Sequence, residues 1–192
     1  MTRFSKSILT FSIGAAFALP VALAQTNVTP ASAILSKTSA GVTVADTTFL
    51  KKAASGGIAE VELGQLAVER ASNPDVKQFA QRMVNDHTKA NSQLKQVAAE
   101  EHIRLPQGLS ARDKAIKDAL AKLSGDDFDR AYMKDMVQDH RQDVAEFERE
   151  SKSTQDPAVK GFAMQTLPTL RDHLKEAQRI APKDQSAQNS SR

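Results

Sequence analysis

An eight-residue segment occurs twice in this chain, and the repeat constrains the fold more than any other feature of the sequence. Residues 73–80 read Asn-Pro-Asp-Val-Lys-Gln-Phe-Ala, and residues 156–163 read Asp-Pro-Ala-Val-Lys-Gly-Phe-Ala. Both copies place a capping Asn or Asp before a proline, which is a common way to start an α-helix because proline at the first position lacks only an N–H that would be unpaired there. We therefore expect two related helical hairpins, each with its second helix starting at the repeat.

The spacing of apolar residues predicts four long helices and almost no β-structure. Apolar residues recur with a helical period of about 3.6 residues, while the alternation that marks strands is scarce. The expected long helices, the first capped by Asp46, cover residues 46–71, 74–102, 125–153 and 157–180, and a short helix covers 111–123. Residues 103–125 are numerous enough to return the chain along the bundle, since a helix rises about 1.5 Å per residue. The expected fold is an all-α, ferritin-like four-helix bundle with a long crossover, in which the second and third long helices run parallel.

Both ends of the chain are expected to lie outside the bundle. Residues 1–24 have the form of a secretory signal peptide, with a basic start, an apolar run and Ala-Leu-Ala before Gln25. Residues 25–45 are expected to form a flexible leader and residues 181–192 a disordered tail, because neither segment has a helical apolar period. The bundle is assigned to residues 46–180, and the predicted location is the periplasm or the outside of the cell.

The composition excludes several classes of function. The chain has 26 basic and 23 acidic residues, and removal of Arg3 and Lys6 with the signal peptide would leave 24 against 23. Such a balance, interleaved along the helices, is typical of a solvated surface and gives no indication of nucleic-acid binding. The chain has no cysteine, so disulfides and thiol chemistry are excluded. No stretch after the signal peptide is apolar enough to span a membrane, and no motif of a catalytic site is present, so no catalytic residue is assigned.

Three of the four histidines lie at the centre of apolar helical stripes. At about 100° of rotation per residue, His87, His140 and His173 each share a helix face with apolar residues one and two turns away. Glu62 on the first helix is also flanked by apolar residues one turn away on each side and is expected to point inward. Buried ionisable groups are costly unless they are paired, hydrogen-bonded or metal-bound. Four such groups near the middle of the bundle therefore predict a shared polar or metal site.

The four side chains have two interpretations, and the sequence leaves both open. They bind one divalent transition ion, since imidazole and carboxylate are ligands of zinc, iron, manganese and copper, or they form a metal-free hydrogen-bond network. Some residues one helical turn from these histidines are possible additional ligands, namely Asp143, Glu176, Met83 and Met136. Methionine beside histidine favours copper, although methionine on an apolar stripe is more often a core residue. His102 lies at a helix end and is expected to be solvated.

Four segments carry a resemblance to a known family. They are Glu-Val-Glu-Leu-Gly-Gln-Leu-Ala (60–67), Val-Lys-Gln-Phe-Ala-Gln-Arg-Met-Val-Asn-Asp-His (76–87), Tyr-Met-Lys-Asp-Met-Val-Gln-Asp-His (132–140) and Leu-Pro-Thr-Leu-Arg-Asp-His-Leu (167–174). In this order they resemble the exported bacterial ferritin-like proteins of the domain of unknown function DUF4142. The resemblance implies a ferritin-like bundle in the periplasm or at the outer membrane, and it implies no activity. Ferritin-like di-iron sites contain Glu-x-x-His pairs, whereas carboxylates follow the histidines here, so ferroxidase chemistry is not expected.

Two classes of function agree with these observations. In the first, the protein is an exported bundle that binds one transition-metal ion and serves in metal buffering or in protection of the envelope from stress. In the second, it is a metal-free, non-catalytic protein of the envelope that acts through interaction or stress tolerance. The metal content of the purified protein would separate the two.

Overall fold

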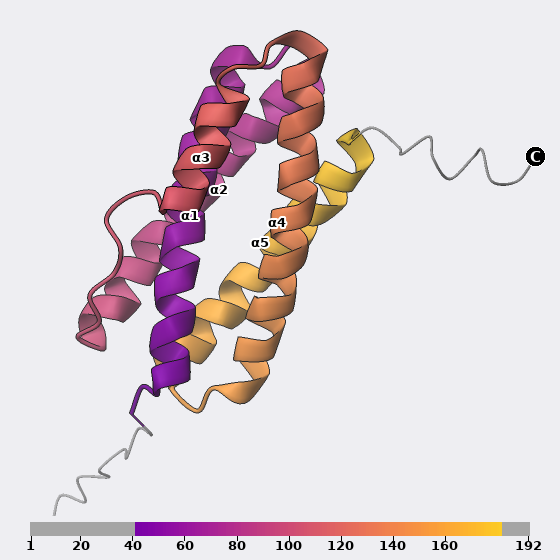
Figure 1. The fold of residues 1–192 in the computed structure, drawn as a ribbon. Helices are drawn as coiled ribbons and strands as arrows, with labels where there is room; N and C mark the ends of the chain where they lie inside the picture. The colour runs from indigo at the N-terminus through magenta and orange to yellow at the C-terminus, as the bar shows by residue number, and fades with distance from the viewer. Residues whose placement is uncertain (1–40, 182–192) are drawn as a thin grey trace, which may run out of the picture. The chain divides into compact units, whose positions relative to one another are not determined.

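The computed structural model describes residues 41–181, and these residues form five helices and no strand (Figure 1). The helices are α1 (Val44–Arg70), α2 (Pro74–Glu100), α3 (Ala111–Leu120), α4 (Gly125–Ser153) and α5 (Pro157–Ile180). The predicted all-α bundle is therefore confirmed. The predicted signal peptide, most of the leader and nearly all of the tail lie outside the described residues. Among the helices of residues 41–181, none combines the length and the hydrophobicity needed to cross a membrane.

The four long helices form two hairpins that pack against each other. α1 packs on α2 and α4 packs on α5, and the hairpins meet where α2 contacts α5 and α1 contacts α4. α1 and α5 run in one direction while α2 and α4 run in the other (Figure 1), so each of these neighbouring pairs is antiparallel. The chain returns from α2 to α4 through a crossover that contains α3, which packs on α1 and α4. The second and third long helices are thus parallel, as predicted.

The two copies of the repeat start α2 and α5 with the same chemistry. Asn73 and Asp156 are the N-caps, and each accepts a hydrogen bond from the backbone N–H two residues further on. Pro74 and Pro157 follow at the first helical position. The predicted hairpin turns are therefore found where the repeat places them.

The start of α1 differs from the prediction in its cap. Thr43 is the N-cap, and its hydroxyl accepts a hydrogen bond from the backbone N–H of Asp46 at 3.1 Å. The Asp46 carboxylate in turn accepts the backbone N–H of Thr43 at 2.7 Å. This reciprocal pair is a capping box, so Asp46 belongs to the first turn of the helix instead of capping it.

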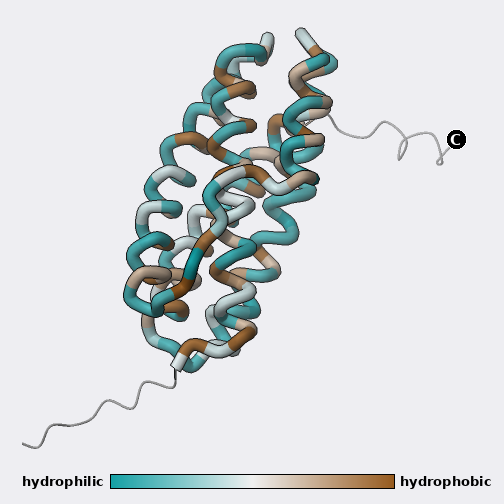
Figure 2. Tube along the Cα trace, turned by 60° about the vertical axis from the view of Figure 1, so that its left-hand side comes forward, coloured by the Kyte–Doolittle hydropathy of each residue, from teal (hydrophilic) through white to brown (hydrophobic). Residues whose placement is uncertain are grey.

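The core of the bundle consists of two apolar clusters that follow one another along its length. The Phe79 cluster comprises mainly Leu63, Ala67, Val76, Phe79, Met83, Phe128, Tyr132, Met133, Met136 and Ala177. The Phe49 cluster comprises mainly Phe49, Leu50, Ala54, Leu94, Phe147, Val159, Phe162, Leu167 and Leu170. Hydrophobic and hydrophilic residues alternate along every long helix, as expected for helices with one buried face (Figure 2). On each long helix the two clusters are separated by one buried ionisable residue, and these four residues form the candidate site.

Candidate metal centre

His87, His140 and His173 meet in the middle of the bundle, as the sequence predicted. They come from α2, α4 and α5, and their exposed fractions are 5%, 0% and 0%. Their ring centroids form a nearly equilateral triangle with sides of 5.8, 5.4 and 5.4 Å. One ring nitrogen of each histidine lies within 4.8 Å of those of the other two. The three imidazoles are thus close enough to contact a single small ligand.

The carboxylate beside these histidines belongs to Glu60 of α1 and not to Glu62, so the predicted position of Glu62 was wrong. Glu60 is only 1% exposed. Its Oε2 lies 2.8 Å from His87 Nδ1, and its Oε1 lies 3.2 Å from His140 Nδ1. Glu62 is half-buried and forms an ion pair with Lys117 of α3 at 2.7 Å. We call Glu60, His87, His140 and His173 the polar layer.

The error has a physical cause in the composition of α1. The large residues Ile58 and Leu66, which flank Glu62, are only half-buried. Around Glu60 the buried stripe contains Leu63 but otherwise mostly small residues, namely Ala54, Gly57, Gly64 and Ala67. Positions two residues apart lie about 200° apart around a helix, so the stripe that includes Glu60 turns Glu62 outward. The spacing of the small residues was the available signal.

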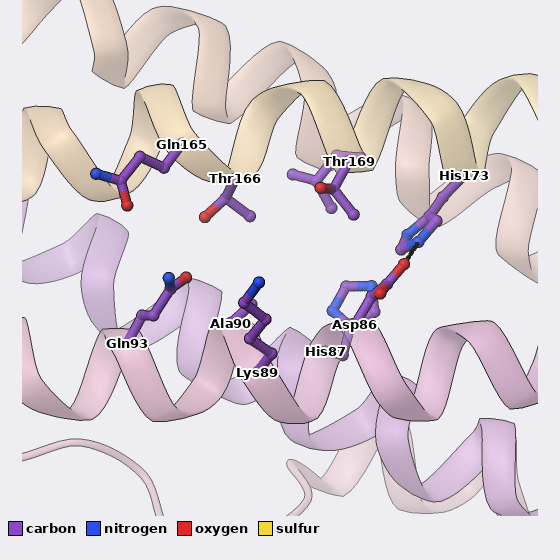
Figure 3. Close-up of a pocket in the computed structure, with 10 residues that line it drawn as sticks. Asp86, His87, Lys89, Ala90, Gln93, Gln165, Thr166, Thr169 and His173 are labelled. Atoms are coloured by element: carbon purple, nitrogen blue, oxygen red, sulfur yellow. Dashed lines mark hydrogen bonds and ion pairs between the residues drawn. The ribbon is translucent and has the colours of Figure 1, made fainter.

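Each histidine of the polar layer has one ring nitrogen beside an oxygen. His140 Nδ1 lies 3.0 Å from the backbone carbonyl oxygen of Met136, and His173 Nε2 lies 2.8 Å from Asp86 Oδ2 (Figure 3). His87 Nδ1 faces Glu60 as described above. A carbonyl or a carboxylate oxygen only accepts hydrogen bonds, so His140 carries its proton on Nδ1 and His173 carries its proton on Nε2.

The other ring nitrogen of each histidine is buried without a hydrogen-bond partner. These atoms are His87 Nε2, His140 Nε2 and His173 Nδ1. The two Glu60 oxygens also lack an aligned hydrogen-bond donor in spite of their short distances to the histidines. Buried polar atoms are seldom left unpaired, because each costs about 1–3 kcal/mol. The polar layer therefore contains a set of nitrogen and oxygen lone pairs that the protein itself does not satisfy.

Burial sets the protonation of the polar layer. Desolvation lowers the pKa of His87, His140 and His173 to about 4 each. Desolvation also raises the pKa of Glu60 to about 8, against the attraction of His140. At neutral pH the three imidazoles are therefore neutral, and Glu60 holds a proton when no cation is near.

A surface network supports His173 from the outside. Burial tends to raise the pKa of Asp86, but hydrogen bonds from His173 and Arg82 bring this pKa below its usual value. Arg82 Nε lies 3.3 Å from Asp86 Oδ2, and Arg82 Nη1 lies 2.7 Å from Glu176 Oε2. Glu176, a predicted additional ligand, is thus engaged by arginine instead of contacting the histidines. The sequence did not identify the histidine partner of Asp86, because His173 lies on a different helix.

The other predicted residues have distinct environments. Met83 and Met136 are fully buried within the Phe79 cluster. Asp143 lies near Glu60 together with Asp139, and one carboxylate oxygen of each lies within 4.8 Å of those of the other two. His102 is exposed beyond the end of α2, as expected.

A cavity of about 280 Å³ between α2 and α5 leads to the polar layer. Its walls are mostly polar and include Asp86, His87, Lys89, Gln93, Gln165 and His173. Figure 3 shows the side chains of the two helices facing each other across this space, with His87 and the Asp86–His173 pair at one end. Two of the three histidines therefore line this cavity.

Comparison with known proteins identifies the family. The family model of DUF4142, a domain of unknown function, matches residues 31–180. The chain belongs to this family. No curated protein is significantly similar to it in sequence.

Solved structures with a similar fold include a DUF305 fragment and CopM. A crystal structure of a DUF305 fragment from Deinococcus radiodurans has a TM-score of 0.64 at 16% identity and covers 73% of this chain and 97% of that one. CopM in its Cu(I)-bound form has a TM-score of 0.60 at 18% identity, covering 77% and 98% of the two chains. CopM in its Ag-bound form has a TM-score of 0.58 at 17% identity, covering 70% and 93%. At these identities the similarity shows the helical-bundle fold alone.

Proposed function

We propose that this protein binds one transition-metal ion at His87, His140 and His173 and acts outside the cytoplasm in metal buffering or envelope protection. The observation that carries the proposal is the set of three buried ring nitrogens without partners, one on each neutral imidazole. Metal ligation requires unprotonated nitrogen. The low histidine pKa values keep all three imidazoles neutral at neutral pH, so that each has one unprotonated nitrogen.

The size of the triangle suits one ion. Three imidazoles around an ion with metal–nitrogen bonds of about 2.0–2.1 Å have ring centres roughly 5 to 6 Å apart. The observed sides of 5.4 to 5.8 Å fall in this range. Three imidazoles with an open position are typical of zinc and are also suitable for copper. We therefore favour these two ions over iron and manganese.

The groups around the histidines support the same role. Metal-bound histidine usually donates its second N–H to a carboxylate or a carbonyl, which fixes the ring. In this protein Asp86 and the Met136 carbonyl hold two of the rings in this way, and Glu60 faces the third. The polar cavity between α2 and α5 gives a hydrated ion a route to His87 and His173.

A metal-free network explains the polar layer less completely. The protons of neutral His140 and His173 are directed to oxygens outside the triangle, so their remaining nitrogens need donors. A protonated Glu60 can donate its proton to His87 Nδ1, so that neutral His87 carries its own proton on Nε2. This Nε2–H is then the donor available within the layer, and it can satisfy one of the two remaining nitrogens of His140 and His173. At least one buried nitrogen then has no partner, whereas one ion contacts all three.

The location and the choice of ion rest on other observations. The form of residues 1–24 supports export. CopM, which shares the fold, has been solved with Cu(I) and with Ag, so copper should be among the first ions tested. Met83 and Met136 lie in the adjacent apolar cluster and are candidates for additional soft ligands.

The test is metal binding by untagged protein, because a histidine tag recruits metal by itself. We expect elemental analysis to find one zinc or copper ion per chain, and calorimetric titration of the metal-free protein to give the same ratio. His140→Ala and His140→Gln should lose this ion. The matched control is His102→Asn, which removes an exposed imidazole outside the site and suits the positive φ of 55° at this position.

Added ion should also raise the melting temperature. An ion at about 100 times its Kd adds about 2.7 kcal/mol to the free energy of unfolding by mass action. The increase should occur in the wild type and in His102→Asn and should be absent in both His140 variants. Equal melting curves with and without zinc, Cu(I), Cu(II), manganese and ferrous iron, together with no retained metal, would favour the metal-free network and a role in interaction or stress tolerance.

A further inference from the structure

We infer that Glu60, Asp139 and Asp143 form a second cation site, adjacent to the histidines, for a divalent ion that prefers oxygen ligands. The inference deepens the proposed function, because Glu60 contacts both groups of side chains. The site would make the polar layer one half of a two-ion centre, with nitrogen ligands on one side of Glu60 and carboxylates on the other.

The geometry of α1 and α4 brings the three carboxylates together. Asp139 and Asp143 are one helical turn apart on α4 and flank His140 in the sequence. One oxygen of each aspartate and one of Glu60 lie within 4.8 Å of one another. Oxygen ligands at about 2.3–2.6 Å from an ion are at most roughly 5 Å apart. The three oxygens are thus close enough to contact one ion of the size of Mn²⁺ or Ca²⁺.

A second observation, independent of this proximity, is the state of Glu60. Its side chain is almost fully buried, and neither of its oxygens has an aligned hydrogen-bond donor. An ionised carboxylate in such a place requires positive charge or several donors. The Nδ1 atoms of His87 and His140 lie 2.8 and 3.2 Å from its oxygens but form no aligned hydrogen bond with them. A cation on the Asp139 and Asp143 side would supply the missing partner.

A small void borders two of the three carboxylates, those of Glu60 and Asp143. It has a volume of about 20 Å³, and its walls include Glu60, Asp143, Asn91 and Thr166. A void of about 10–15 Å³ on this scale holds one water, so there is room for a ligand water beside Glu60 and Asp143. Thr166 Oγ1 in the wall also lacks a partner, so a polar atom besides the two carboxylates borders this otherwise mostly apolar void.

In the described part of the chain, no direct ion pair neutralises these aspartates, although Arg112 attracts Asp139 and Lys52 attracts both from a distance. Among the ion pairs formed by residues 41–181, none includes Asp139 or Asp143. Lys52 of α1 forms its ion pair with Glu146 instead. Three neighbouring carboxylates without a basic partner in contact repel one another when they are ionised, and a divalent cation relieves that repulsion.

The experiment counts Mn²⁺ on the mature protein after the histidines are filled with Zn²⁺. Zinc is silent in electron paramagnetic resonance, and free Mn²⁺ gives a sharp signal that disappears on binding. We expect one Mn²⁺ per chain in the wild type and loss of this binding in Asp139→Asn and in Asp143→Asn. Glu62→Gln is the matched control, since it removes a carboxylate from α1 that pairs with Lys117 outside the site, and it should bind Mn²⁺ like the wild type.

The outcomes separate this inference from the proposed function. Mn²⁺ binding that is absent in wild-type protein holding one zinc per chain, or unchanged in both aspartate variants, would overturn the carboxylate site, while the single zinc still supported the histidine site. Mn²⁺ bound by His140→Ala without zinc, and lost when Asp143→Asn is added, would support the carboxylate site although the histidine site had failed. Two zinc ions in the wild type that fall to one in Asp143→Asn would support a second position as well. Circular dichroism establishes that each variant is folded, and the removal of a repelling charge should not lower stability.

Discussion

Glu60 is the residue on which both candidate ion positions depend. Burial raises its pKa to about 8, above the value of 4.5 taken for an exposed glutamate. A raised pKa in the folded state stabilises the fold at low pH, and this contribution is lost as the pH rises from about 4.5 through 8. Ionisation of Glu60 without a cation therefore weakens the bundle on the alkaline side.

Glu60→Gln should remove part of this alkaline loss. The amide keeps the shape of the side chain but has no charge to bury, so the metal-free variant should be more stable than the metal-free wild type at pH 8.5. The difference between the two should shrink as the pH falls to 5. Urea denaturation at several pH values, with chelator present, measures the difference in the free energy of unfolding between the variant and the wild type. A difference that is independent of pH would mean that Glu60 ionises freely in the folded protein.

The small residues of α1 show how sequence and structure diverge at single positions. The three histidines could be predicted because large apolar residues surround them on their stripes. Glu60 could not be chosen over Glu62 by the same criterion, since glycine and alanine mark its face and contribute little to an apolar pattern. Asp86 precedes His87 in the sequence, but the histidine that it contacts, His173, lies on another helix, and a single helical period carries no information about a neighbouring helix.

At the scale of helices, Gly64 sets how closely α1 approaches α2. A Cβ at Gly64 would lie 2.9 Å from Val84 Cγ2 and 3.2 Å from the Ala80 carbonyl oxygen. A Cβ at Gly56 would meet nothing within 4 Å. Both glycines are inside the same helix, so they form a matched pair.

Gly56→Ala should stabilise the protein and Gly64→Ala should destabilise it. Alanine in a helix is favoured over glycine by about 0.5–1 kcal/mol, and this gain is available at Gly56 without a steric cost. At Gly64 the new methyl group must move Val84 and separate the two backbones. Thermal unfolding of the two variants tests the contrast. If both variants gained the same stability, the α1–α2 contact would be looser than the structure indicates.

The repeat predicts the starts of α2 and α5 correctly, because its cap and proline act locally. The predicted cap of α1, Asp46, lies three residues after the true N-cap, Thr43. Asp46 has the chemistry of a cap, but it occupies the N3 position of the capping box. Helix ends and the crossover followed from local breakers such as proline and glycine. The short distances within the polar layer depend on how four helices pack, and that information is spread over the whole chain.

Phe79 and Phe162 occupy matching positions in the two repeats and anchor different clusters. Phe79 is fully buried and its ring lies 6.4 Å from that of His173. Phe162 is 5% exposed, and its ring centroid lies 5.7 Å from that of Phe147. Truncation of either to alanine should cost about 3–5 kcal/mol, which chemical denaturation measures. Phe79→Ala should in addition weaken metal binding, because it frees the His173 ring, whereas Phe162→Ala should leave affinity nearly unchanged in the folded protein.

For the whole molecule, the buried groups predict how the stability of the metal-free protein changes with pH. The three histidines, whose pKa values are lowered to about 4, contribute stability that is present above about 6.5 and lost as the pH falls toward 4. The buried acids act in the opposite sense, since burial raises the pKa of Glu60 to about 8, of Glu150 to about 7 and of Asp135 to about 6.

Below about pH 6.5, where the histidines titrate in the unfolded chain, the effects of the buried histidines and of the buried acids on stability oppose each other. We therefore expect the free energy of unfolding to change little between about pH 5 and 6.5. Above 6.5 the acids act alone, and the free energy of unfolding should fall steadily to pH 8.5. Bound metal should reduce this alkaline loss, because positive charge stabilises ionised carboxylates. Denaturation curves with and without zinc measure both trends. Rising stability of the metal-free protein above pH 7 would contradict the assigned protonation of the buried acids.

The division of the core into the Phe79 and Phe49 clusters has a consequence for cooperativity. Two apolar clusters that meet at a layer of ionisable side chains share little hydrophobic contact, so each end of the bundle can open while the other stays folded. An ion at the layer contacts helices from both hairpins at once and links the two ends into one unfolding unit. Bound metal would thus couple the unfolding of the two ends. Amide hydrogen exchange should then give the same opening free energy for both ends only when metal is bound.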